Sequence, residues 1–170
     1  MLRQFVLLRY STARYSSNVD LVDREIVDLL QRDASLSARE VAERVNLTPT
    51  PCWRRIQRLE RDGIIAKRVA LVDPAAVNLA VSALVHVRTN RHNAEWLDQF
   101  TAAIDHFPEI VEAYRTSGEV DYMLRVVVPD MAAYDEFYKQ LIEEVELYDV
   151  RTIFVMEEMK RTTALPLDYA

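Results

Sequence analysis

The sequence predicts an α+β chain with two parts: an amino-terminal part built of helices and a carboxy-terminal part in which strands and helices alternate. Apolar residues recur with the helical period up to about residue 61, and stretches of period two begin at residue 81. The charge also changes sign, because residues 1–72 hold 13 basic and 9 acidic residues and residues 73–170 hold 8 and 18. A chain of 170 residues that is half hydrophobic can bury two small cores. We therefore expect two domains with different partners.

Two capped helices open the amino-terminal part. Asp20 can cap a helix that runs to about Arg32, with apolar residues at helical spacing. Ser37 and Glu40 have the spacing of a capping box, which predicts the start of a second helix. The first helix is expected to pack across the pair of helices that follows it.

A third helix follows after a very short connection. Asn46-Leu47 leaves room only for a tight turn, so the second and third helices form a helix-turn-helix. Thr48 is expected to cap the third helix with its hydroxyl, and Pro49 falls at the first helical position, where a missing N–H costs nothing. Gly63 is expected to end this helix.

The third helix is predicted to have an apolar back and an arginine front. Cys52, Ile56 and Leu59 share one face at about 100° per residue. The lone Cys52 excludes an intramolecular disulfide, and its position favours a small buried hydrophobe over a redox or metal role. Arginine runs are often only solvated helix surface, so this face gains its meaning from the helix-turn-helix around it. The opposite face is predicted to hold Thr50, Arg54, Arg58 and Arg61, with Arg55 on a flank.

A short segment leads out of the helices. Residues 64–72 are rich in β-branched side chains, which predicts a strand or wing, and Asp73-Pro74 closes it. The predicted domains are a helix-turn-helix domain with linker strand over residues 19–72, a linker over residues 73–80 and a second domain over residues 81–170.

The first 18 residues lie before this pattern. Their apolar run, residues 5–8, is far too short to span a membrane. Arginines and serines without acids resemble a weak targeting sequence, but we favour a flexible basic arm or an extended translation start over residues 1–18.

The carboxy-terminal part predicts a ferredoxin-like sandwich. Apolar residues at 81, 83, 85 and 87 alternate with Ser82, His86 and Arg88, as in a strand with one buried face. The order strand, helix, strand, strand, helix, strand is the split βαβ arrangement. The expected elements are a strand over 81–87, a helix from Asn93 to Phe107, strands over 110–116 and 121–128 joined by a turn at 117–119, a helix after Pro129-Asp130 and a strand over 150–156.

The sequence gives no sign of catalysis. The three histidines show no spacing that would build a metal site, and no nucleophile has a spaced base. We expect no metal and no cofactor, and a protein that is not an enzyme.

Three motifs in order resemble the Lrp/AsnC (feast/famine) family of prokaryotic transcription regulators. The resemblance covers roughly residues 19–167. It implies a cytoplasmic regulator that binds double-stranded DNA and a small amino-acid effector, with no membrane. It also implies a homodimer formed through the sheet of the second domain, assembly of dimers into a tetramer or octamer, and an effector bound between dimers. The motifs are residues 47–60, residues 117–122 (Ser-Gly-Glu-Val-Asp-Tyr) and residues 155–160 (Val-Met-Glu-Glu-Met-Lys).

The predicted DNA-binding residues lie on and around the third helix. Arg54 and Arg58 are expected to contact bases, because a guanidinium can bind guanine O6 and N7 in a forked geometry. The remaining arginines and lysine are expected to hold phosphates. The full predicted set is Thr48, Thr50, Arg54, Arg55, Arg58, Arg61, Lys67 and Arg68.

The predicted effector site centres on the turn between two strands. Gly118 can offer backbone N–H groups to a carboxylate, and Asp121 or Glu119 can accept from an ammonium group. The alternative is that Gly118 only makes a tight hairpin and Asp121 is a turn residue. Further candidates, which could equally be core or interface residues, complete the set: Ser117, Gly118, Glu119, Asp121, Tyr122, Met131 and Thr152.

A finer resemblance joins residues 52–53, 95–96, 134–139 and 162–166 to a subgroup of regulators of cysteine or aromatic amino-acid breakdown. It suggests a local activator or repressor of a catabolic operon. The glycine-free connection at residues 145–149 departs from the family, so leucine is not carried over as the effector. The alternatives are an architectural DNA-binding protein without a ligand and, less favoured, a small amino-acid-binding enzyme.

Overall fold

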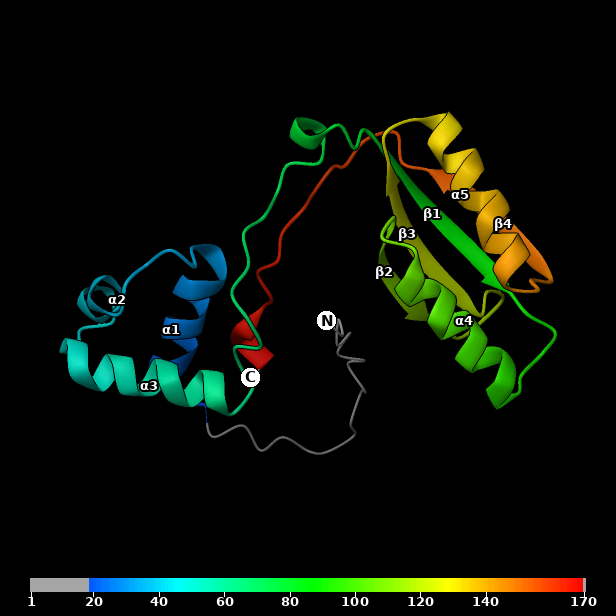
Figure 1. Cartoon of the computed structure of the whole chain (residues 1–170). Coiled ribbons are helices and arrows are strands. Elements are labelled where there is room, and N and C mark those ends of the chain that lie inside the picture. The colour runs from blue at the N-terminus through cyan, green and yellow to red at the C-terminus, as the bar shows by residue number, and fades with distance from the viewer. Residues whose placement is uncertain (1–18, 170) are drawn as a thin grey trace. The chain divides into compact units, whose positions relative to one another are not determined.

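The computed structural model describes residues 19–169, and the predicted basic extension over residues 1–18 lies outside them. The chain divides into two compact units (Figure 1). Within the described residues, the first unit comprises residues 19–71 and 160–169, and the second comprises residues 72–159. The first unit therefore also contains residues 160–169, which the sequence predicts to belong to the second domain.

The first unit holds three helices around a small core: α1 (Leu21–Arg32), α2 (Ala38–Arg44) and α3 (Pro49–Arg61). The predicted helices are confirmed. Cys52 is fully buried on the back of α3, as expected for a small hydrophobe. The core residues of this unit are Ile26, Leu30, Leu36, Val41, Ala42, Val45, Cys52, Ile56 and Leu59.

Two of the three predicted caps form. Ser37 N–H donates to Glu40 Oε2 over 2.8 Å, and Glu40 N–H donates back to Ser37 Oγ over 3.3 Å. The hydrogen bonds from Ser37 hold the pKa of Glu40 below its usual value, so this cap is intact at neutral pH and weakens only as the pH falls through that lowered pKa. Asp20 forms a second capping box with Asp23.

The predicted hydroxyl cap of α3 is wrong. Thr48 occupies the N-cap position with extended backbone, but its side chain makes no capping hydrogen bond. An N-cap oxygen normally accepts from the N–H of the second or third helical residue; the third residue here is Pro51, which has no N–H, so only the N–H of Thr50 remains as a donor. Pro49 at the first position is as predicted.

The predicted strand over residues 64–72 does not form. Ile65 N–H bonds to Leu59 O over 3.0 Å, and residues 66–72 have no regular structure. A strand needs a neighbouring strand to receive its backbone hydrogen bonds, and the strands of residues 19–169 pair only with one another, in the second unit. The β-branched composition alone could not supply that partner.

The second unit has the predicted order of elements. They are β1 (Val81–Arg88), α4 (Ala94–His106), β2 (Ile110–Arg115), β3 (Tyr122–Val128), α5 (Met131–Glu144) and β4 (Asp149–Phe154), preceded by a 3-10 turn, η1 (Ala75–Val77). The strands form one antiparallel sheet in the order β2-β3-β1-β4. This is the ferredoxin-like arrangement.

Both helices of the second unit cover the same face of the sheet (Figure 1). Val85, Phe100, Leu124 and Leu141 are fully buried between sheet and helices. Side chains of the other face, among them His86 as predicted, point away from this core because successive residues of a strand alternate. We call that side the open face. Its residues include Leu84, His86 and Arg88 on β1, Tyr114 on β2, Met123 and Arg125 on β3, and Asp149, Arg151 and Ile153 on β4.

The carboxy-terminal tail, residues 160–169, belongs to the first unit. The Gln31 amide on α1 donates to Leu165 O and accepts from Leu165 N–H, both over 2.9 Å. A 3-10 turn, η2 (Leu167–Tyr169), follows directly. The side chain of Gln31 thus pairs with the tail backbone as a neighbouring strand would.

Candidate functional site

The turn before α3 presents that helix at the surface of the first unit. Asn46 has a φ of 54°, in the left-handed region that asparagine tolerates better than most residues. Leu47 N–H donates to Ala42 O over 2.9 Å, which keeps the turn tight. The outer side of α3 is therefore offered to a partner while Cys52, Ile56 and Leu59 hold its back in the core.

Three of the four residues predicted for the outer face of α3, namely Thr50, Arg54 and Arg61, are exposed as predicted. Trp53, with 53% of its surface exposed, and Gln57 lie there and were missed by the arginine-centred reading. Their spacing from Thr50 follows the helical pattern i, i+3, i+4, i+7, i+11, a signal that could have found them. We call this the outer stripe: Thr50, Trp53, Arg54, Gln57 and Arg61, all exposed.

Arg54 is the cation best placed to meet a ligand. Within residues 19–169, its guanidinium forms no ion pair or hydrogen bond with another residue. Gln57 donates to Glu60 Oε2 over 3.0 Å, and Arg61 donates to the adjacent Asp62 over 3.0 Å, an exposed pair that is easily exchanged for another partner.

Arg55 and Arg58 instead turn toward α1. Arg58 donates to Asp23 Oδ2, and Arg55 Nη1 donates to Asp23 Oδ1 over 2.8 Å and to Asp20 Oδ2 over 2.6 Å. Asp23 is fully buried. The bond from Arg55 holds the pKa of Asp20 below its usual value, and the two aspartates raise the pKa of Arg55. We call these four side chains the Asp23 cluster: Asp20, Asp23, Arg55 and Arg58.

The predicted position of Arg58 on the face opposite the core was therefore wrong. It shares the flank of Arg55, because residues three apart on a helix are neighbours. The buried carboxylate of Asp23 needs compensating charge, and Arg58 and Arg55 supply it.

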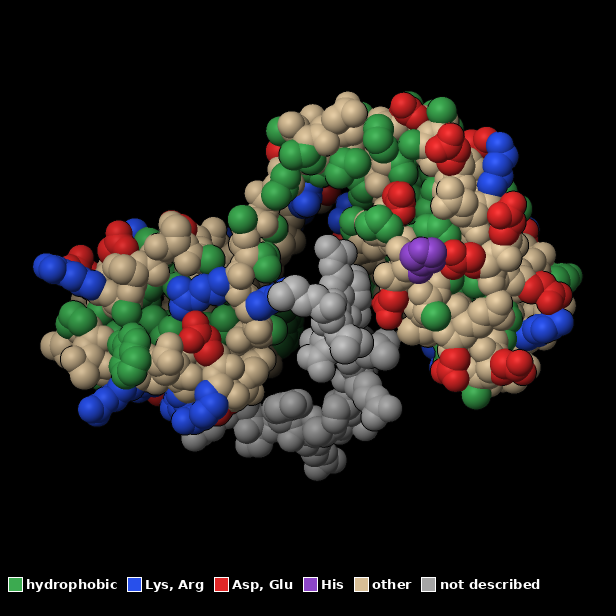
Figure 2. Space-filling view, in the orientation of Figure 1, with side chains coloured by type: hydrophobic (Ala, Val, Ile, Leu, Met, Phe, Trp, Pro, Cys, Tyr) green, Lys and Arg blue, Asp and Glu red, His purple; other side chains and the backbone are tan. Residues whose placement is uncertain are grey.

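The other predicted DNA-binding residues are exposed but differ in their partners. Arg68 donates to Glu60 Oε1 over 3.0 Å, whereas Lys67 and Thr48 are simply exposed. On the face drawn in Figure 2, the first unit carries Lys and Arg side chains together with acidic ones, whereas acidic side chains are the more frequent charged groups over the second unit.

The predicted effector residues in the turn before β3 differ in exposure and in hydrogen bonding. Gly118 has a φ of 125°, which strains any other residue, and Ser117 and Glu119 beside it are exposed. The Asp121 carboxylate accepts from Thr89 N–H over 2.9 Å, so one of its oxygens already joins the turn to the end of β1.

The three remaining effector candidates, Tyr122, Thr152 and Met131, lie outside the turn. Tyr122 packs in the core, with its ring 4.7 Å from that of Phe100. Thr152 on β4 hydrogen bonds to the hydroxyl of Tyr134 on α5. Met131 is 54% exposed at the start of α5. Met131 and the turn lie at opposite ends of β3, roughly 20 Å apart for a strand of this length. One copy of the chain does not bring all seven candidates together.

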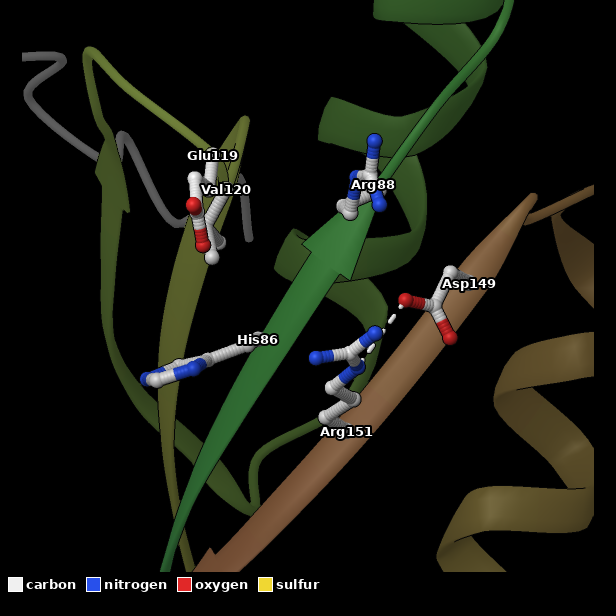
Figure 3. A pocket seen from close by; sticks show the side chains of 6 residues that line it. All are labelled: His86, Arg88, Glu119, Val120, Asp149 and Arg151. Carbon is white, nitrogen blue, oxygen red and sulfur yellow. Dashed lines mark hydrogen bonds and ion pairs between the residues drawn. The ribbon is translucent and has the colours of Figure 1, made fainter.

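A hollow on the open face contains one of the predicted residues (Figure 3). Its volume is about 500 Å³, and it is lined by His86, Arg88, Glu119, Val120, Asp149 and Arg151. Arg151 Nε donates to Asp149 Oδ2 over 3.1 Å, and the Arg88 guanidinium lies 5.9 Å from the centre of the Tyr148 ring. Of the seven predicted effector residues only Glu119 reaches this hollow.

Residues 19–169 contain no group of three or more His, Cys, Asp or Glu side chains arranged to hold a metal ion. None of their helices combines the length and apolar character that crossing a membrane requires.

Comparison with known proteins covers both units. Residues 19–66 match the winged helix-turn-helix DNA-binding family, and residues 82–165 match the Lrp/AsnC ligand binding domain. The DNA-binding transcriptional activator DecR of Escherichia coli is 46% identical over 88% of this chain and 99% of its own. The glutamate uptake regulatory protein of Zymomonas mobilis is 43% identical over 88% of this chain and 91% of its own.

Solved structures agree with these matches. An AsnC family transcriptional regulator from Agrobacterium tumefaciens is 54% identical, with a TM-score of 0.85 over 88% of this chain and 98% of its own. A transcriptional regulator of Neisseria meningitidis, solved as a complex with L-Met, is 35% identical, with a TM-score of 0.85 over 88% of this chain and 97% of its own. The chain therefore belongs to the Lrp/AsnC family: it is a DNA-binding transcriptional regulator with an amino-acid-binding domain, and not an enzyme.

Proposed function

We propose that this regulator acts in the cytoplasm on an operon of amino-acid metabolism, which it reads through the exposed side of α3. The observation that carries the proposal is Arg54, an exposed guanidinium on the second helix of a helix-turn-helix that no residue of the described chain engages. A homodimer places two such helices in successive major grooves about 34 Å apart, on a partly palindromic site.

Charges around α3 position the protein on the duplex. Arg61, Lys67 and Arg68 hold phosphates, so affinity falls steeply as salt rises. Arg55 and Arg58 form ion pairs with Asp23, so their charges are less available to DNA than that of Arg54. We assign the main base contact to Arg54 and a weaker contact to Arg58.

The open face of the sheet supports assembly. It exposes apolar side chains, including Ile153 and Tyr114, at about half of their surface. A monomer rarely leaves such a face uncovered. We propose that a second copy covers it in the dimer, and that dimers join into a tetramer or octamer so that several weak DNA sites act together.

The effector site lies between copies in this proposal. A small α-amino acid would meet the backbone N–H groups of the turn at Gly118 and the carboxylate of Glu119, and Met131 of another copy would complete the site. This division is supported by the roughly 20 Å between the turn and Met131 within one copy. Relatives described as a glutamate uptake regulator and as an L-Met complex support an amino acid as the ligand class. The effector shifts assembly because it binds the assembled state more tightly.

The first prediction concerns Arg54. We expect Arg54→Ala to lower affinity for the selected operator about 100-fold per dimer, because each of two forked guanine contacts contributes about tenfold. Electrophoretic mobility shift on selected and random DNA measures the loss. Lys139→Ala, which removes one positive charge from the exposed side of α5, is the matched control and should keep wild-type affinity. Retained selectivity in Arg54→Ala would exclude this residue from base reading.

The second prediction concerns the effector. Ligands that bind only the folded protein raise its thermal midpoint, by the equivalent of about 2.7 kcal/mol at 100 times Kd. We expect a selective rise with one class among the twenty amino acids, kynurenine and homocysteine. Glu119→Gln should reduce that rise, whereas Glu95→Gln, at an exposed position of α4, should not. Asp121→Ala is a poorer variant because it also breaks the bond to Thr89. A flat response to every compound would favour an architectural DNA-binding protein without a ligand.

A further inference from the structure

An exposed tryptophan stands beside Arg54 on the outer stripe. Trp53 has 53% of its surface exposed, whereas the second tryptophan, Trp96, is 3% exposed within the core of the other unit. A large indole left half-exposed between charged side chains loses the hydrophobic stabilisation that burial would give it. Such a residue is enriched where a partner later covers it.

The neighbours of Trp53 indicate what that partner is. Thr50, Arg54, Gln57 and Arg61 share its side of α3, and none of them is acidic. A protein partner would meet two guanidinium groups around one indole, whereas a DNA duplex presents phosphates to those cations and base edges to the residues between them. The outer stripe therefore fits the major groove of DNA.

The position of Trp53 and Arg54 along α3 indicates that they meet base edges. Trp53 and Arg54 lie in the amino-terminal half of α3, the part of a recognition helix that meets base edges. The Asp23 cluster draws Arg55 and Arg58 away to the flank. Base reading is thereby left to the outer stripe and not to the arginine series as a whole.

We infer that Trp53 and Gln57 are specificity residues that read bases on either side of Arg54. The apolar indole of Trp53 takes the methyl group of a thymine, and the Gln57 amide takes N6 and N7 of an adenine. Gln57 Nε2 donates one N–H to Glu60 Oε2, and its second N–H and its amide oxygen are the groups that would pair with the adenine. The inference rests on the proposed function of α3 in DNA reading.

Selection of binding sites from a random DNA pool tests the inference with the full chain. We expect Trp53→Ala to lose the thymine preference at one position of each half-site, and Gln57→Ala to lose an adenine preference at another. Affinity for the wild-type site should fall about tenfold per half-site with either variant. The salt dependence of binding should stay as in wild type, because neither side chain neutralises a phosphate.

The controls separate this inference from the proposed function. Leu21→Ala removes another exposed apolar side chain, 74% exposed on α1, and should leave the selected site unchanged. A wild-type protein that selects no site would overturn the proposed function itself. A wild-type protein with a clear site that both Trp53→Ala and Gln57→Ala also select would overturn the inference alone.

Fluorescence gives a second readout that does not depend on selection. The emission of Trp53 should be quenched when the protein binds its selected DNA, because the indole becomes covered by bases. In Trp53→Phe, where only buried Trp96 remains, the DNA-induced change should disappear. An undiminished change in Trp53→Phe would show that the indole does not contact DNA.

Discussion

Replacing Asp23 by alanine is expected to lower the free energy of unfolding of the first unit by about 3 kcal/mol, since breaking a buried ion pair typically costs 3–5 kcal/mol. Asp23 is fully buried and accepts from Arg55 and Arg58, so its loss leaves two guanidinium groups without their shared partner. It also removes half of the capping box at the start of α1.

Hydrogen exchange followed by mass spectrometry measures this loss unit by unit, because the exchange rate of each peptide reports its own opening. Peptides of α1 and α3 should lose protection while peptides of the sheet keep it. Asp28→Ala, which breaks the exposed pair with Arg32, is the control and should leave protection nearly unchanged. Unchanged protection of α1 and α3 in Asp23→Ala would mean that the cluster contributes little to stability.

Replacing Phe100 by alanine is expected to destabilise the second unit by about 4 kcal/mol, the usual range for a buried phenylalanine being 3–5 kcal/mol. The Phe100 ring is fully buried, 4.9 Å from Trp96 and 4.7 Å from Tyr122. The cavity would lie directly behind the hairpin that carries the proposed effector turn, so the effector response should also fall.

Urea unfolding monitored by Trp96 fluorescence in a Trp53→Phe background measures this loss. Leu97→Ala removes a side chain that is 37% exposed on the same helix and should cost much less. If exchange in α1 and α3 rose as much as exchange in the sheet, the two units would not be independently stable.

Local patterns in the sequence were sufficient for most of the fold. Period-two alternation located β1, and Asp20, Ser37 and Asn93 cap their helices with their own side chains. These signals act over a few residues, so they can be read without knowing the tertiary structure.

The errors share a different origin. Arg58 was misplaced because its partner Asp23 lies 35 residues away and is buried. Residues 64–72 lack a strand because no neighbouring strand is available in the described chain. At Thr48, Pro51 removes one of the two N–H groups from which an N-cap oxygen accepts, and the hydroxyl forms no capping hydrogen bond. These outcomes depend on which residues pack together in the fold and on which backbone groups are available for hydrogen bonds. Residue type alone shows neither.

The sequence predicts those residues of the candidate site that are identified by a pattern over a few neighbouring positions. Arg54 follows from helical periodicity, and the same periodicity places Trp53 beside it although the indole carries no charge. The effector residues could be selected from the turn motif, but the core packing of Tyr122 and the bond from Thr89 to Asp121 required the fold.

The pairing of Gln31 with Leu165 has a consequence for how the protein is made. The two residues are 134 positions apart, so α1 to α3 leave the ribosome long before the tail that joins them. The DNA-binding unit is therefore completed only after residues 160–169 have been made, behind every strand of the other unit. A premature stop codon near residue 160 would spare every strand of the effector-binding unit and still remove part of the DNA-binding one.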